Sequence, residues 1–301
     1  MASKTPKTLT HSDYTVAWIC ALSIEQTAAI AMLDEEHADL PQPPSDPNAY
    51  SLGSLSKHNI VIACLPKGRI GNSSSATVIT QLINTFRNIK ISLLVGIGGG
   101  MPPEVRLGDV VVSSPTHVYP GVVQWDLGKA EQEGGFRRIG ALDNPPTALL
   151  TALGKLESKH ELHGSSIQQY LKEVSIKHEN LSEDYTCSDG LEDILFRPEY
   201  SHRESEDIQD RTSTKKRKHR DTAGKEEPAC RYCDRAMEIK RPARHRQIHY
   251  GLIASGNQVI KDAGVRDRIN RRLDGHVRCF EMEAAGLMTS FPCVVIRGIC
   301  G

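Results

Sequence analysis

Short, almost uninterrupted apolar runs constrain the fold of this 301-residue chain more than any other feature. Strands that are buried on both faces have this pattern, and they belong to parallel sheets covered by helices. The predicted strands are 14–22, 59–65, 91–95, 109–112, 248–256 and 293–299. Apolar residues recur at helical spacing in 23–37, 73–86, 257–273 and, after a strand end, 279–291. This alternation predicts an α/β domain with a mostly parallel sheet and helices on both faces.

The two ends of the chain differ in what they add to this fold. Residues 1–12 are polar, and we expect them to be disordered ahead of a single domain that spans 13–301. Ser23 and Gln26 have the spacing of a capping box, which predicts that the first helix begins at Ser23. The last strand, 293–299, has no helix after it, so we expect the C-terminal part of the fold to be missing from this chain.

The middle of the chain has weak apolar periodicity. One short helix is expected at 146–156, and 157–246 is expected to be a partly disordered insertion rich in Ser, Glu, Lys and His. The basic run KKRKHR at 215–220 has the composition of a nucleic-acid patch or a localisation signal, but acidic residues flank it on both sides. A solvated loop is the better interpretation.

Composition limits the partners and the compartment. Lys+Arg and Asp+Glu number 37 each, so net charge gives no argument for nucleic acid or a membrane surface. No apolar run approaches the roughly 20 residues that span a bilayer, and the polar N-terminus lacks the apolar centre of a signal peptide. Several of the eight cysteines lie inside apolar runs, which favours reduced thiols and a cytoplasmic protein.

Acidic residues lie near the predicted carboxyl ends of the strands, where open α/β sheets bind ligands. Glu25 is in the first turn of the first helix, where an acidic residue also complements the helix dipole. Glu281 and Glu283 stand two apart among apolar residues, and a carboxylate there can accept two hydrogen bonds from a ribose diol. The glycine-rich stretch VGIGGGMPP at 95–103 is either a tight turn or a place of close ligand approach.

The stretch CRYCDRAMEIKRPARHRQIHYG at 230–251 has zinc-finger spacing at Cys230, Cys233, His245 and His249. However, His249 lies in a predicted core strand, whereas both histidines of a finger lie on one helix. We therefore predict no metal site, and a zinc or nucleic-acid module at 215–249 is the third of three alternatives. The CxxC pair itself is left without an explanation.

Three stretches together resemble the nucleoside phosphorylase/nucleosidase superfamily: AWICALSIEQTAA, LLVGIGGGMPPEVRLGDVVVSSP, and IHYGLIASGNQVIKDAGVRDR with CFEMEAAGLMTSFPCVVIRGIC. They cover about 13–128 and 247–300 and look like the fungal version found N-terminal to NACHT, ankyrin or tetratricopeptide regions. The resemblance implies a three-layer sandwich with a mixed, mostly parallel central sheet. It also implies cleavage of a nucleoside N-glycosidic bond by water or phosphate, without a cofactor, in a homo-oligomer.

The resemblance also assigns roles to individual residues. Glu25 matches the glutamate that positions water, and Met282 with Glu283 matches the pair that holds the ribose. Gly96, Gly98 and Gly99 match the glycine turn under the nucleophile. The base pocket would include Phe280 and Val259, where the family often has a stacking aromatic residue.

Three further positions depart from the family pattern. Leu94 and Ile97 replace the arginine and serine that contact phosphate in the phosphorylase branch, which favours hydrolysis unless Arg69 or Arg106 supplies the charge. Gly301 stands where the family has the aspartate that protonates the leaving base, so we expect purine cleavage by this chain to be impaired.

Two functions follow from these positions. The first is purine nucleoside or nucleotide cleavage as the enzymatic module of a larger fungal receptor-like protein. The second is an inactive nucleoside-binding or scaffold module. The base, the choice between water and phosphate, and the oligomeric state are left open by the sequence.

Overall fold

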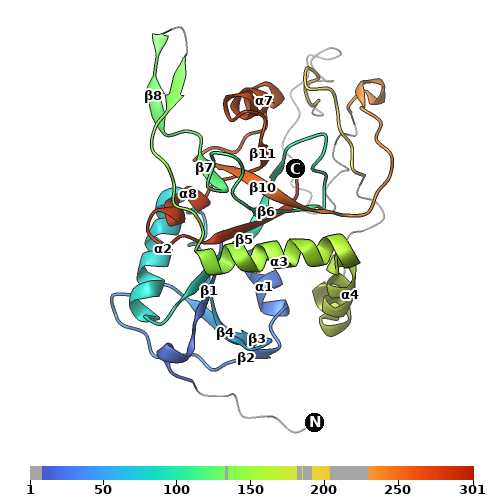
Figure 1. Cartoon of the computed structure of the whole chain (residues 1–301). Coiled ribbons are helices and arrows are strands. Elements are labelled where there is room, and N and C mark those ends of the chain that lie inside the picture. Colours follow the sequence, from blue (N-terminus) through green and yellow to red (C-terminus); the bar gives the residue numbers. More distant parts are fainter. Residues whose placement is uncertain (1–8, 133–134, 182–184, 186–191, 204–229, 231) are drawn as a thin grey trace, which may run out of the picture.

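The computed structural model describes residues 9–132, 135–181, 185, 192–203, 230 and 232–301. Its centre is a sheet with the strand order β11-β10-β6-β12-β5-β1-β4-β3-β2, and β7 pairs with β10 (Figure 1). The strands are β1 Val16–Cys20, β2 Glu35–Glu36, β3 Tyr50–Leu55, β4 His58–Cys64, β5 Ile91–Gly100, β6 Val110–Ser113, β7 Val122–Gln124, β10 Ile248–Ser255, β11 Val277–Glu281 and β12 Val294–Ile299. A separate hairpin, β8 Gly128–Ala130 with β9 Phe136–Arg138, projects from the body.

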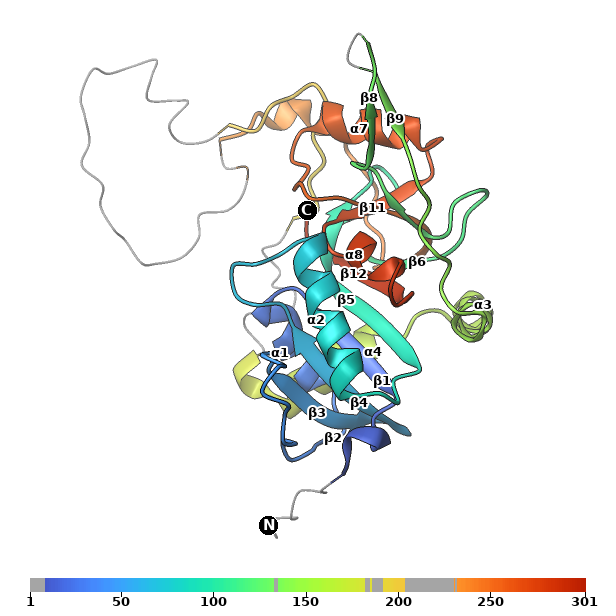
Figure 2. The same cartoon turned by 90° about the vertical axis from the view of Figure 1, so that its left-hand side faces the viewer.

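Helices cover both faces of this sheet. They are α1 Ser23–Ala31, α2 Asn72–Thr85, α3 Thr147–His163, α4 Ile167–Lys177, α7 Ala263–Arg272 and α8 Ala284–Met288. Three 3-10 turns are also described: η1 His11–Asp13, η3 Glu179–Leu181 and η4 Arg235–Met237. Helices α2 and α8 lie side by side on one face (Figure 2).

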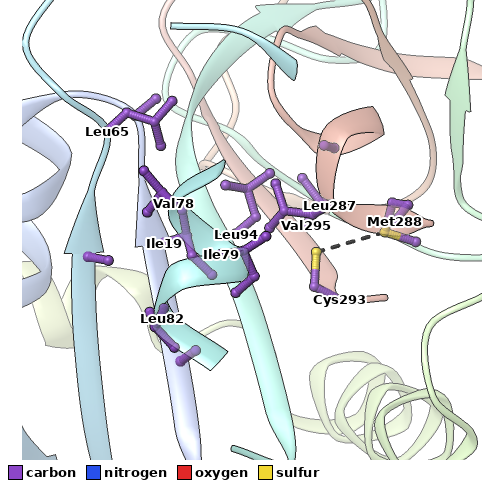
Figure 3. Packing of buried hydrophobic residues seen from close by; sticks show 14 of the residues in the cluster. Ile19, Leu65, Val78, Ile79, Leu82, Leu94, Leu287, Met288, Cys293 and Val295 are labelled. Carbon is purple, nitrogen blue, oxygen red and sulfur yellow. Dashed lines mark hydrogen bonds between the residues drawn. The ribbon is translucent and has the colours of Figure 1, made fainter. Parts of the chain in front are cut away.

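Alternation along β1 explains the three layers. Ala17 and Ile19 face one hydrophobic cluster with Ile79 and Leu82 of α2, and Figure 3 shows Ile19, Ile79 and Leu82 converging there with Leu94. Trp18 faces the opposite cluster, which includes Ala29 of α1. Side chains alternate along a strand, so a continuous apolar run provides a buried surface for helices on each face. The predicted sandwich with a mixed, mostly parallel sheet is confirmed, since β1 pairs in parallel with β4 and β5 while β12 is antiparallel to β6.

Several local features differ from the sequence-based expectation. Of the terminus expected to be disordered, His11 and Ser12 begin η1, and the Asn88 side chain donates to the Ser12 carbonyl. The helix expected at 146–156 extends to His163 as α3, and α4 follows inside the expected insertion. Helix α4 docks through Lys177 and His178, which contact backbone carbonyls of Leu33 and Ala31. Neither helix has a buried residue, and the contacts that hold α4 to the core are polar, so no apolar face indicated these helices in the sequence.

Two helix boundaries also differ from the sequence-based expectation. Helix α1 does begin at Ser23, but Ser23 is not its cap: the Glu25 carboxylate accepts from the backbone N–H of Leu22. Helix α7 begins at Ala263 and not at 257, because the side chain of Asp262 caps it by accepting from Val265 N–H. Within the insertion, 182–184, 186–191, 204–229 and 231 lie outside the described residues, and these include the basic run 215–220.

Candidate functional site

Glu25 occupies the first turn of α1, immediately after β1. Its buried carboxylate accepts hydrogen bonds from Ala21 N–H (2.6 Å) and Leu22 N–H (3.0 Å), and across to β5 from Ile97 N–H (2.8 Å). The same side chain therefore caps the helix and joins it to the glycine-rich strand. Three backbone donors fix the carboxylate at the carboxyl end of the sheet.

The glycine-rich stretch is not a turn. Gly96 to Gly100 continue β5 as an extended strand that pairs with β12 and, in antiparallel fashion, with β11. A Cβ on Gly96 would overlap the Glu25 carboxylate and lie 2.5 Å from Arg297 Nη1, and one on Gly98 would lie 2.6 Å from Cys279 Sγ. Gly99 is freer, because its nearest neighbour would be the Gly301 carbonyl at 3.8 Å. Glycine is thus required where charged side chains approach the strand closely.

Arg297 of β12 is the charged centre of the site, and the sequence analysis did not identify it. The residue is only 1% exposed. Its guanidinium donates to Glu281, to Glu283 Oε2 (3.3 Å) and to the Ile97 carbonyl (3.3 Å). Burial lowers the pKa of Arg297, but Glu281, Glu283 and Glu25 outweigh that effect and raise it. The available signal was a single charge inside the apolar strand CVVIRGI, which is costly to bury without partners.

The two glutamates after β11 have different environments. Glu281 accepts from the backbone N–H groups of Glu283 (3.0 Å) and Ala284 at the start of α8, in addition to Arg297. Glu283 accepts from Gly71 N–H at 3.3 Å and from Arg297 at the same distance. Burial raises the pKa of Glu283 and so do Glu281 and Glu25, against the opposing effect of Arg297 and Gly71 N–H, with a net rise. Glu281 is a helix cap and ion-pair partner, whereas Glu283 keeps more of its accepting capacity.

Polar groups from loops surround the carboxylates, and the sequence analysis did not single them out. Ser255, at the end of β10, accepts from Ala285 N–H (3.0 Å) and donates to Asn72 Oδ1 (3.4 Å). Asn72 N–H donates to Asn257 Oδ1 (3.3 Å), and Asn257 N–H donates to Asp126 (2.7 Å). Within the described part of the chain, the buried Nδ2 of Asn72 and Nε of Arg297 have no hydrogen-bond partner. Their place at strand ends was the only signal in the sequence.

The remaining predicted residues are more scattered. Met282 is half-buried, and its carbonyl faces Gly71. Phe280 packs in a buried cluster with Tyr119, Val123 and others, whereas Val259 is 65% exposed. The structure therefore brings Glu25, Glu283 and the glycine strand together. The two proposed base-pocket residues differ, because Phe280 is buried and Val259 is exposed.

Gly301 lies beside the glycine strand. Its carbonyl accepts from Gly100 N–H at 2.7 Å, and a Cβ on Gly301 would meet nothing within 4 Å. A longer side chain at this position has room.

Another buried carboxylate, Asp109, lies apart from this site. It accepts five hydrogen bonds: two from Arg244, one from His249 Nε2 and two from the backbone N–H groups of Arg106 and Gln247. Burial raises the pKa of Asp109, but these donors outweigh it and hold the pKa at about 2. His249 lies in β10 as predicted, and its bond to Asp109 removes it from the finger pattern.

Comparison with known proteins identifies the fold of this chain but not the function of a full-length protein. No family model matches the sequence. A "nucleotide-binding leucine-rich repeat (NLR)-like protein" of Hyaloscypha variabilis is 41% identical over 300 residues, and the match covers 97% of this chain. The chain spans 27% of that relative's length.

Solved nucleosidases share the architecture. The methylthioadenosine/S-adenosylhomocysteine nucleosidase of Colwellia psychrerythraea, with adenine bound, has a TM-score of 0.51 at 17% identity, covering 97% of this chain and 84% of that one. The enzyme of the same kind from S. pneumoniae, with the transition-state inhibitor MT-ImmA, gives 0.50 and 15%, covering 95% and 84%. Helicobacter pylori futalosine hydrolase gives 0.51 and 15%, covering 96% and 85%. The chain therefore has the nucleosidase fold, and among the described residues no helix is long and apolar enough to cross a membrane.

Proposed function

We propose that this chain binds a purine nucleoside, or a related nucleotide, and cleaves its N-glycosidic bond with water, within a larger receptor-like protein. The observation that carries the proposal is the convergence of Glu25, Glu283 and Arg297 on the glycine strand β5. A ribosyl transition state resembles an oxocarbenium ion, and buried carboxylates stabilise such developing positive charge.

Each carboxylate has a distinct proposed role. Glu283 accepts from Gly71 N–H and Arg297, and its remaining lone pairs would accept the two ribose hydroxyls. Met282 would pack against the sugar. Glu25, fixed by three backbone donors, would orient the attacking water over Ile97. Arg297 favours the ionised form of Glu283, against the effect of burial, and is a positioning residue in this scheme.

Water is favoured over phosphate because the arginines near the site are engaged or distant. Leu94, at the place of the phosphorylase arginine, is fully buried. Arg297 is ion-paired with Glu281 and Glu283. Arg106 donates to the Pro242 carbonyl and faces Asp193. Arg69, exposed in the loop before Gly71, is the remaining candidate for phosphate.

Gly301 motivates a second candidate, a nucleoside-binding module without turnover. A general acid is typically worth about 10²–10⁴ in rate, and glycine cannot supply one. The open space around Gly301 would accept an aspartate without displacing neighbours. Gly301→Asp therefore separates a site that lacks its acid from a site that never cleaves.

The test incubates the chain and its Gly301→Asp variant with adenosine, inosine, methylthioadenosine and ATP, with and without phosphate, and measures free base by chromatography. We expect slow base release from the chain and at least about 10²-fold faster release from Gly301→Asp. Release that does not depend on phosphate identifies hydrolysis. Dependence on phosphate that is lost in Arg69→Ala would identify phosphorolysis.

Glu25→Gln and Glu283→Gln should abolish release in the Gly301→Asp background, whereas Glu36→Gln, at an exposed sheet edge, serves as the matched control. Calorimetry with MT-ImmA separates binding from turnover. Tight binding without base release would favour the binding module. The absence of both MT-ImmA binding and base release would contradict both candidate functions.

A further inference from the structure

The CxxC pair, which the sequence left without an explanation, forms a tight turn in the structure. Cys233 N–H donates to the Cys230 carbonyl at 3.1 Å, and Cys230 has a positive φ of 67°. The two sulfur atoms lie within 4.8 Å of each other. Cys233 is 8% exposed and Cys230 is partly buried.

His202 completes the cluster from a distant part of the insertion. Its Nδ1 lies 3.3 Å from Cys233 Sγ and 3.8 Å from Cys230 Sγ, and all three ligand atoms lie within 4.8 Å of one another. In tetrahedral zinc with bonds of about 2.3 Å to sulfur and 2.0–2.1 Å to nitrogen, neighbouring S and N ligands are about 3.6 Å apart. The two observed S···N distances fall on either side of that value.

We propose that His202, Cys230 and Cys233 form a zinc site and supply three of its ligands. Two thiolates and an imidazole are the donors that favour Zn²⁺ over Mg²⁺ or Ca²⁺. This ligand set differs from the finger pattern in the sequence, because His202 replaces the pair His245 and His249. It also replaces our sequence-based expectation of no metal.

The two ligand segments are held together independently of any metal. Arg197 N–H donates to the Met237 carbonyl (3.1 Å), and Ile239 N–H donates to the Leu195 carbonyl (2.7 Å). Nearer the ligands, Asp234 N–H donates to Tyr200 Oη at 2.6 Å. These contacts bring 195–202 alongside 233–239, so the ligand geometry follows from an organised backbone.

This small lobe is also tied to the loop that follows the glycine strand. Arg241 pairs with Asp193 at 2.7 Å and donates to the Pro103 carbonyl, and Leu107 N–H donates to Asp193 at 3.4 Å. Zinc would therefore act as a structural staple that fixes the lobe against the core. Each thiol loses its proton to solvent when zinc binds, and no electron is transferred. Because the thiols must be deprotonated to bind the metal, zinc affinity should weaken as the pH falls.

The test measures zinc in the purified full chain by elemental mass spectrometry, followed by titration of chelator-stripped protein with Co²⁺ under reducing conditions. We expect one zinc per chain and a thiolate-to-cobalt charge-transfer band. Cys233→Ser and His202→Asn should each weaken metal affinity at least about tenfold, since even a second-shell change costs 10–100-fold. His202 is exposed, so His202→Asn keeps the test valid if Cys233→Ser does not fold.

His245→Asn is the matched control, because His245 is exposed and belongs to the finger pattern only. It should bind zinc like the original chain. Zinc retained in His202→Asn, or lost in His245→Asn, would overturn the assignment. So would a reduced, folded chain that takes up no zinc or cobalt, or a Cys230–Cys233 disulfide that persists under mild reductant. None of these results bears on nucleoside cleavage.

Discussion

Two buried arginine–carboxylate clusters in this molecule differ in how fully their charges are satisfied. At Asp109 one carboxylate receives five hydrogen bonds, including two from Arg244, and its pKa falls to about 2. At Arg297 one guanidinium faces Glu281 and Glu283, with Glu25 nearby, and the pKa of Glu283 rises. The first cluster has more donors than its carboxylate needs. The second has more negative charge than its single cation balances.

This difference separates a structural staple from a site. Asp109 joins the start of β6 to Gln247 and His249 at the start of β10. A buried carboxylate whose hydrogen bonds are all satisfied is suited to such a structural role. The Arg297 cluster leaves the guanidinium Nε and the Asn72 amide without hydrogen-bond partners among the described residues. An unsatisfied atom also lies next to Asp109, where the Nε of Arg106 has no hydrogen-bond partner in the described part of the chain, so the excess of negative charge is what distinguishes the Arg297 cluster.

The largest effect should come from removing the central cation. Arg297→Met leaves Glu281 and Glu283 buried without a counter-charge, which typically costs about 3–5 kcal/mol of stability. Urea unfolding at neutral pH measures it. If the variant does not fold, Arg297→Lys should recover part of the loss, because it keeps the charge but not the forked geometry. A Met variant as stable as the original chain would mean that the carboxylates are neutral.

Asp109→Asn should cost about 2 kcal/mol at neutral pH, which corresponds to a pKa lowered from 3.8 to about 2. Because the folded-state pKa lies below the unfolded one, this stability is complete above about pH 4. It is lost as the pH falls toward 2. Unfolding free energies measured across this range should therefore decline less in Asp109→Asn than in the original chain, with Glu36→Gln as control. Equal declines in the unfolding free energies of the two proteins would contradict the structural role of Asp109.

Gly96→Ala tests the close approach at the site. The added methyl would overlap the Glu25 carboxylate, and such overpacking typically costs about 1–3 kcal/mol. Gly298→Ala on the neighbouring strand β12 is the matched control, because a Cβ there meets nothing within 4 Å. Thermal unfolding of the pair checks the prediction, and similar losses in both variants would show that strand propensity dominates.

The smallest effect on stability should come from Glu283→Gln, at less than about 1 kcal/mol. The raised pKa of Glu283 means that the fold disfavours its ionised form, so ionisation removes stability as the pH rises, and glutamine avoids that loss. Nucleoside binding should nevertheless disappear, as calorimetry with MT-ImmA would show. A large loss of stability with intact binding would reverse the roles assigned to the two clusters.

Much of the fold followed from local patterns. Runs such as 59–65 and 293–299 form β4 and β12, because a short, continuous apolar run is typical of a strand that is covered on both faces. The short strand β7, the edge strand β2 and its neighbour β3 were missed, since they are brief or carry polar residues. The hidden helix α4 is positioned by contacts to α1 and the segment after it, which no local pattern records.

The sequence by itself determined the layered α/β fold, the place of Glu25 at a helix start and the unusual apolar setting of Glu281 and Glu283. Only the tertiary structure decided that Arg297 balances these carboxylates, that the glycines form a strand and not a turn, and that His202 rather than His249 joins the two cysteines. Hydrophobic periodicity is a local property, so it can be read along the chain. Charge pairing and metal-ligand geometry depend on residues brought together from distant segments, and their partners are fixed only when the sheet is assembled.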